Sequence, residues 1–133
     1  MFYSKYLKNN ICFTHQCIQC CIKTSMFLTN NDIETIRKEG YEPKDFFREK
    51  NGWLMLKNRE GKCVFHNGLI CLIYQFRPEG CRLYPLIFDD ELNISVIDDD
   101  CPFGDEFEIN TNDIKHLSDL IQQLKKERKQ RLP

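Results

Sequence analysis

The segment CLIYQFRPEGCRLYP, residues 71–85, gathers thiols, cationic side chains and prolines within one short stretch of the chain. Pro78 and Pro85 are expected to fix the turns that present Cys81, because proline presets the backbone geometry and interrupts strand pairing. The segment therefore predicts a turn-rich site that carries cysteines, around which the rest of the chain folds.

A second group of thiols lies near the N-terminus, in the order Cys12-x4-Cys17-x2-Cys20-Cys21. The step from Cys17 to Cys20 is the spacing at which one tight turn directs two sulfurs to one metal centre. Adjacent side chains diverge in extended backbone, so one of Cys20 and Cys21 is expected to serve a second centre, another iron of the same cluster, or only the core. All eight cysteines are candidate metal ligands: Cys12, Cys17, Cys20, Cys21, Cys63, Cys71, Cys81 and Cys101.

The number of cysteines indicates metal binding in a reducing compartment. Eight cysteines in 133 residues are too many for chance burial, and in a secreted protein they would suggest disulfides. Residues 1–13 offer no continuous apolar stretch, so no secretory signal is expected. In the cytoplasm, metal coordination protects thiolates from oxidation and stabilises a small fold, so we expect a cytoplasmic metal-binding protein.

Other uses of the cysteines find less support in the sequence. A thioredoxin-like pair would need a βαβ unit around Cys17 and Cys20, and none is visible. A zinc ribbon would need a second Cys-x2-Cys pair, and only Cys63-x2-His66 offers a comparable spacing. His66 is expected to be a hairpin residue and His15 to face solvent. No cysteine is marked as a nucleophile by its setting.

Length and composition are those of one small globular domain. Of the 133 residues, 41% are hydrophobic and 29% are charged. The formal charge of -1 lacks the positive excess that nucleic-acid binding requires, and no span reaches transmembrane length. We expect one domain over residues 1–133, with a core at about 11–105 and a C-terminal helix at about 112–131.

The pattern of turns and apolar residues predicts a small, irregular, metal-stabilised α+β domain with short β-hairpins and a few helices. Thr29 to Asp32 form a capping box that begins a helix ending at Gly40. A second short helix is expected near Pro43, with Phe46 and Phe47 buried. Strands are predicted at 53–56, 63–66, 69–74, 82–88 and 92–97, with turns at 59–62, 67–68 and 89–91.

The C-terminal helix is marked by apolar residues at helical spacing: Ile114, Leu117, Leu120, Ile121 and Leu124. Its basic end, from Lys125 to Arg131, is expected to be solvated, because cations suit a helix C-terminus. The same basic end offers a protein partner its one visible contact surface, although a charge run this short is weak evidence for one.

Four motifs follow one another between residues 11 and 101: Cys12-x4-Cys17-x2-Cys20-Cys21, Leu28-Thr29-x2-Asp32-Ile33, Gly61-x-Cys63-x-Phe65 and Cys71-x-Ile73-Tyr74-x2-Arg77-Pro78-x2-Cys81-Arg82-x-Tyr84-Pro85. With these motifs, the stretch resembles the YkgJ-type cysteine-cluster family, described as a zinc- or iron-chelating domain. The step from Cys12 to Cys17 is longer than the family's usual spacing, and Ile18 stands where the family commonly has glycine. A similar constellation occurs in flagellin lysine N-methylases, which implies an iron–sulfur cluster rather than zinc.

The leading hypothesis is a protein that holds an iron–sulfur cluster, most simply a 4Fe–4S cluster, through cysteine thiolates. Structural or chelated zinc is the alternative for the metal. An iron–sulfur-dependent group-transfer enzyme, similar to a protein lysine methylase, and a metal-delivery module are the alternatives for the function. The sequence leaves open whether the protein is an enzyme.

Two arginines are candidates for contacts with the bound metal group. A centre with four thiolates carries about two negative charges, which Arg77 and Arg82 would offset through N–H to sulfur contacts. The alternative is that both arginines pair with the acidic loops at 89–91 and 98–100.

Overall fold

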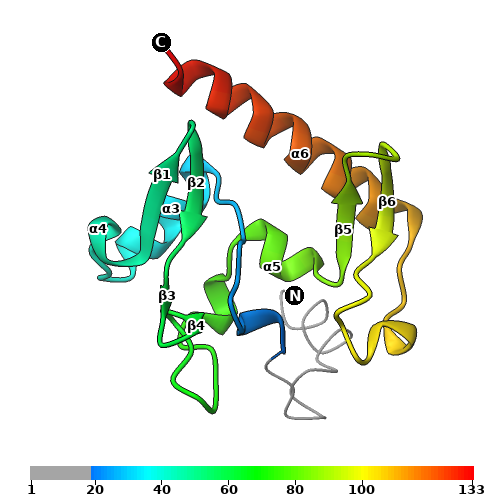
Figure 1. The fold of residues 1–133 in the computed structure, drawn as a ribbon, viewed down its shortest axis with the longest axis horizontal. Helices are drawn as coiled ribbons and strands as arrows, with labels where there is room; N and C mark the ends of the chain where they lie inside the picture. Colours follow the sequence, from blue (N-terminus) through cyan, green and yellow to red (C-terminus); the bar gives the residue numbers. More distant parts are fainter. Residues whose placement is uncertain (1–18) are drawn as a thin grey trace.

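The computed structural model describes residues 19–133, so Cys12, Cys17 and His15 lie outside the described residues (Figure 1). The described range combines helices with three two-stranded antiparallel sheets, which confirms the expected α+β class. The elements are η1 Gln19–Cys21, α3 Asn30–Lys38, α4 Pro43–Phe46, β1 Phe47–Lys50, β2 Trp53–Leu56, β3 Asn58–Arg59, β4 Lys62–Cys63, η2 Tyr74–Phe76, α5 Glu79–Leu83, β5 Leu86–Asp89, β6 Ile94–Ile97, η3 Gly104–Glu106 and α6 Thr111–Arg131.

The two short N-terminal helices form where the sequence predicts them. The Asp32 N–H donates to Thr29 Oγ1 at 2.9 Å, and the Thr29 N–H donates to Asp32 Oδ2 at 3.0 Å, so the capping box begins α3. Phe46 in α4 is 1% exposed, as expected. The expectation for Phe47 is wrong: this residue opens strand β1 and is half-buried, with its side chain packed against the edge of the core.

Strand β1 is an element that the sequence analysis did not predict. It pairs with the expected strand β2 in the register Lys50↔Trp53, so Asn51 and Gly52 form a two-residue turn between them. Their φ angles of 52° and 82° are both positive, as a type I′ turn requires. The expected turn at 59–62 is also present, between β3 and β4.

The predicted strand 69–74 is wrong. The chain makes only an isolated β-bridge here, between His66 and Cys71. The reason is local: Asn67 Oδ1 accepts the N–H groups of Leu69 and Ile70, both at 2.9 Å, so these amides are not available to a ladder.

The predicted strand 82–88 is wrong in its first half, because helix α5 begins after Pro78 and continues through Leu83. Proline suits the start of a helix, where its fixed φ costs nothing and no N–H is needed. Cys81 consequently lies on a helix and not in a turn. The second half of the predicted strand is present as β5, which pairs with β6 in the register Leu86↔Ile97.

The expected C-terminal helix is present as α6. Its buried leucines, Leu117, Leu120 and Leu124, pack with Leu83 and Leu86 in one hydrophobic cluster. Leu28, Ile36, Phe46, Leu54, Leu56, Cys63, Phe65 and Ile73 form the other. None of the helices within residues 19–133 has both the length and the apolar character needed to cross a membrane.

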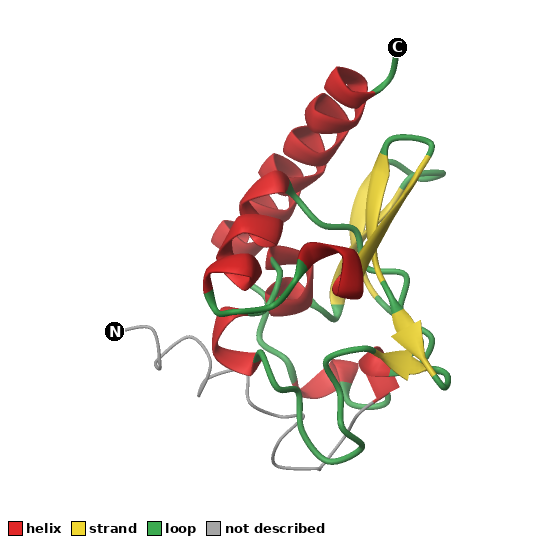
Figure 2. Ribbon diagram, turned by 90° about the vertical axis from the view of Figure 1, so that its left-hand side faces the viewer, coloured by secondary structure: helices red, strands yellow, loops and turns green. Residues whose placement is uncertain are grey.

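The basic end of α6 is not simply solvated, which corrects the sequence-based expectation. Arg128 Nε donates to the Asn51 carbonyl and Arg131 Nη1 to the Gly52 carbonyl, each at 2.8 Å. Figures 1 and 2 both show this end of α6 meeting the tip of the β1–β2 pair. Carbonyls at a two-residue turn point outward, so they can accept these charged donors.

The first turn of α3 connects the helices to one another. The Asn30 N–H donates to Glu127 Oε1 of α6 at 2.8 Å, and Glu127 is 5% exposed. Asp32 Oδ1 accepts the Glu79 N–H at the start of α5, at 3.1 Å. The capping residue of α3 thus also caps the helix that carries Cys81.

Candidate metal centre

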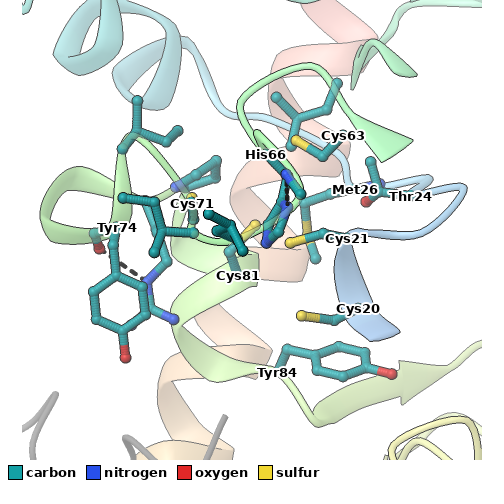
Figure 3. Close-up of a pocket in the computed structure, with 17 residues that line it drawn as sticks. Cys20, Cys21, Thr24, Met26, Cys63, His66, Cys71, Tyr74, Cys81 and Tyr84 are labelled. Atoms are coloured by element: carbon teal, nitrogen blue, oxygen red, sulfur yellow. Dashed lines mark hydrogen bonds between the residues drawn. The ribbon is translucent and has the colours of Figure 1, made fainter. Parts of the chain in front are cut away.

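A cavity of about 510 Å³ brings together most of the described cysteines. Five of the six line it, from four separate segments: η1, β4, the His66–Cys71 bridge and α5. Figure 3 shows their side chains around one common space. The five are Cys20, Cys21, Cys63, Cys71 and Cys81.

Cys20 and Cys21 both line this cavity, although they are adjacent in sequence. They lie in the 3₁₀ turn η1, in which successive side chains are about 120° apart and not on opposite faces as in a strand. The expected divergence of the two side chains applies to extended backbone and does not arise here. Cys20 is exposed and Cys21 half-buried.

Backbone hydrogen bonds hold the next two cysteines in place. Cys63 lies in β4 opposite Asn58 and is 7% exposed. Cys71 faces His66 across the isolated bridge, where the Leu72 N–H donates to the Phe65 carbonyl at 2.9 Å. The loop 67–70 between them turns the chain back, so thiols eight residues apart reach the same cavity.

Cys81 is positioned by close packing of α5. A Cβ atom added to the neighbouring Gly80 would lie 2.3 Å from Met26 Sδ, so the helix touches the segment that follows η1. A larger residue at this position would force the Met26 side chain to move. Met26 and Cys81 line the same cavity as Cys20 and Cys21.

The buried thiols hold their protons more tightly than thiols in water. Burial raises the pKa of Cys63 to about 11, and burial also raises the pKa of Cys71 and, more strongly, of Cys81. Negative charge on Cys20, Cys63 or Cys71 would raise the pKa of Cys81 further, which reflects their closeness. A bound cation would have to displace these protons.

The two candidate arginines have different surroundings. Arg77 lines the cavity, and its guanidinium lies 3.9 Å from the centre of the Tyr74 ring. Burial raises the pKa of Cys71 and Cys81, and the Arg77 charge offsets a small part of this rise. Arg82 forms a salt bridge with Glu79 at 3.2 Å, a pairing that the sequence analysis did not consider, and does not line the cavity.

Cys101 does not line the cavity, but it lies close to Tyr84, which does. The Tyr84 hydroxyl donates to Asp98 Oδ2 at 2.6 Å. Burial and this hydrogen bond raise the Tyr84 pKa, and negative charge on Cys101 or Cys20 would raise it too. The sequence analysis gave Tyr84 no role, because nothing local links it to Asp98.

His66 also lines the cavity and is 9% exposed. Its Nδ1 accepts the Gly68 N–H at 3.0 Å, and burial together with the charge of Lys62 lowers its pKa. The sequence analysis considered it a hairpin residue. The Cys63-x2-His66 spacing was the signal that pointed to a place beside the thiols.

The donor set suits a thiophilic metal, since thiolates and imidazole favour zinc and iron–sulfur centres. Cys21, Cys63, Cys71 and Cys81 are free thiols, which metal binding requires. Within residues 19–133, however, no three Cys, His, Asp or Glu side chains already have the arrangement of ligands around one ion. The residue types therefore fit a metal group, and binding would draw the thiols closer together.

One comparison with known proteins finds a match. The model of a family described as "CxxCxxCC: Putative zinc- or iron-chelating domain" matches residues 11–102. Neither the curated proteins nor the solved structures contain a significant match.

Proposed function

The chain belongs to the CxxCxxCC family of zinc- or iron-chelating domains, and from this premise we propose that it holds an iron–sulfur cluster through cysteine thiolates. One observation carries the proposal: five cysteines from four separate segments line a single cavity. A cysteine that is buried only as a small hydrophobic residue does not need other cysteines around the same cavity. A cluster would also explain why a small domain places thiols on so many different elements.

The arrangement of the thiols favours a cluster over a single zinc ion. Structural zinc takes four ligands around one point, whereas a cluster attaches thiolates to several irons. Cys20 and Cys21 are neighbours on one turn and line the same cavity, so they can bind different irons of one cluster. The composition of the donor set, dominated by sulfur, agrees with this choice.

The proposal assigns roles to the residues of the cavity. Cys63, Cys71 and Cys81 are the buried or half-buried ligands, and η1 supplies the rest from Cys20 and Cys21. Arg77 offsets the negative charge of the centre from its place over Tyr74. Cys12 and Cys17 are further candidate ligands, whereas Cys101 and Arg82 lie outside the cavity lining. A bound cluster would supply one-electron redox chemistry.

The test is metal and acid-labile sulfide analysis of protein purified without oxygen. We expect iron and sulfide in near-equal amounts and broad visible absorption from sulfur-to-iron charge transfer. Cys81→Ser should lose both, while the matched control Cys101→Ser should keep them. Stoichiometric zinc without sulfide would replace iron in the proposal, and protein that binds neither metal would refute it.

A further inference from the structure

His66 is a buried polar residue whose chemistry the proposed ligand set does not use. Figure 3 shows its imidazole reaching into the cavity from the segment between β4 and the bridge to Cys71. It is 9% exposed and shares the cavity with five cysteines. Its two ring nitrogens can therefore form hydrogen bonds with groups of the cavity.

One hydrogen bond fixes the protonation pattern of the His66 ring. Nδ1 accepts the Gly68 N–H at 3.0 Å, so Nδ1 carries a lone pair and the proton of the neutral imidazole lies on Nε2. Among residues 19–133, the structure gives this Nε2–H no acceptor. Five cysteines line the same cavity as His66, so their sulfurs are the candidate acceptors.

This pattern is the opposite of the one expected for a metal ligand. A histidine that binds metal through one nitrogen carries its proton on the other and donates it to a carbonyl, carboxylate or water. If Nε2 bound the metal, the proton of the neutral ring would lie on Nδ1. The Nδ1–H and the Gly68 N–H would then be two donors facing each other, and the observed hydrogen bond would be lost. The spacing Cys63-x2-His66 therefore does not define a ligand pair.

We propose that His66 donates its Nε2–H to a metal-bound cysteine sulfur of the cavity and tunes the centre without binding the metal. The inference rests on the proposed function, because it needs a thiolate-bound group in this cavity. Hydrogen bonds to cluster sulfurs withdraw negative charge and raise the reduction potential. His66 is thus a positioning residue, with the Gly68 amide holding its ring in orientation.

Two substitutions test the two ring nitrogens of His66 separately. His66→Asn places an amide oxygen where Nδ1 accepts the Gly68 N–H, but nothing at the Nε2 position. His66→Gln places an amide N–H near the Nε2 position and gives up the Nδ1 acceptor. His116→Asn is the control, since His116 lies on α6 and pairs with Glu79 at 2.8 Å, outside the cavity lining.

The reduction potential of the iron-loaded proteins is the main measurement. We expect all three variants to keep their iron, His66→Asn to shift the potential downward, and His66→Gln and His116→Asn to stay near the wild type. Loss of iron from both His66 variants would make His66 a ligand and overturn the proposal. The proposal would also be overturned if His66→Asn left the reduction potential unchanged and His66→Gln lowered only the stability. His66 would then serve only to hold the loop at Gly68 in place.

A separate measurement distinguishes failure of this inference from failure of the iron assignment. Nitrogen-15 NMR of the ring reports which nitrogen carries the proton, whatever metal is bound. Nε2–H is expected, and a proton on Nδ1 would refute the inference.

If the protein holds zinc, the thiolates are tested by alkylation. Iodoacetamide should alkylate the thiolates of His66→Asn faster than those of His66→Gln, because a donated hydrogen bond lowers thiolate nucleophilicity. Equal rates would refute it.

Discussion

Two Asn-Gly pairs in this chain have opposite outcomes. Asn51-Gly52 joins β1 and β2 in a two-residue hairpin, whereas Asn67-Gly68 begins a loop that is followed only by an isolated bridge. In the first pair both φ angles are positive, and in the second only that of Gly68 is. The dipeptide alone therefore does not decide between hairpin and loop.

The side-chain hydrogen bonds around each dipeptide account for the difference. At the first pair, which we call the hairpin turn, Arg128 and Arg131 bind the outward carbonyls. At the second, which we call the cavity loop (residues 67–72), the Asn67 oxygen and His66 Nδ1 take up backbone amides. The hairpin turn anchors the C-terminal helix, and the cavity loop forms a rim of the thiol cavity.

Metal removal should separate the two regions most strongly. Chelation of the metal is expected to lower the free energy of unfolding by several kcal/mol, because metal binding is coupled to folding in small domains. Hydrogen exchange should rise first in the cavity loop and in α5, while the hairpin turn and α6 keep their protection. If hydrogen exchange rose equally in both regions, or in neither, the metal would not stabilise the cavity loop in preference to the hairpin turn.

High pH should have the next largest effect, on the metal-free protein. The pKa of Cys63 is raised from 9.0 to about 11, so the folded state holds this proton more tightly than the unfolded chain. Its contribution is complete below the unfolded pKa and is lost as pH rises through about 11, which costs roughly 3 kcal/mol. Urea unfolding across this range should show the loss, and Cys63→Ala should make it smaller but not abolish it, because the pKa values of Cys71 and Cys81 are raised as well. An equally steep loss in Cys63→Ala would assign the effect to other groups.

Alanine at the two turn glycines compares the regions directly. Gly52 has a φ of 82°, and an added Cβ would lie 2.9 Å from Arg128 Cγ, so Gly52→Ala should cost about 2 to 3 kcal/mol without metal loss. Gly68 has a φ of 99° but only Lys62 Nζ nearby, at 3.9 Å, so Gly68→Ala should cost about 1 to 2 kcal/mol. Thermal unfolding measures both. A larger cost at Gly68 would reverse the comparison.

The smallest expected effect is that of Arg128→Ala. The substitution removes the hydrogen bond to Asn51 and the guanidinium that lies 4.9 Å from the centre of the Trp53 ring. A loss of about 1 kcal/mol is expected, with metal content unchanged. Fluorescence of Trp53, the one tryptophan of the chain, should report the local change. Loss of metal from this variant would show that the two regions are coupled.

Features that depend on neighbouring residues could be predicted from the sequence. The capping box of Thr29 and Asp32 and the apolar spacing of α6 act within a few residues, and both predictions are confirmed. Helix α5 was missed because its first amide is capped by Asp32, 47 residues away in sequence. The end of α6 was misjudged for the same reason, since its partners lie in a distant hairpin turn.

The sequence likewise identified some residues of the candidate site and missed the roles of others. Cysteines were recognisable by type and number, although their spacing did not show that Cys20 and Cys21 would line one cavity through a 3₁₀ turn. The role of Tyr84 depends on a contact with Asp98, 14 residues away in sequence, that no local pattern encodes. The identities of the ligands among the cysteines remain a prediction.

X-ray absorption at the metal edge of the protein as purified tests the central claim, that thiolates from distant segments bind one metal centre. The account predicts a shell of sulfur neighbours, at about 2.3 Å if the metal is zinc, and an additional iron–iron shell if it is a cluster. A shell made up only of nitrogen and oxygen neighbours, at about 2.0 to 2.2 Å, would contradict the account.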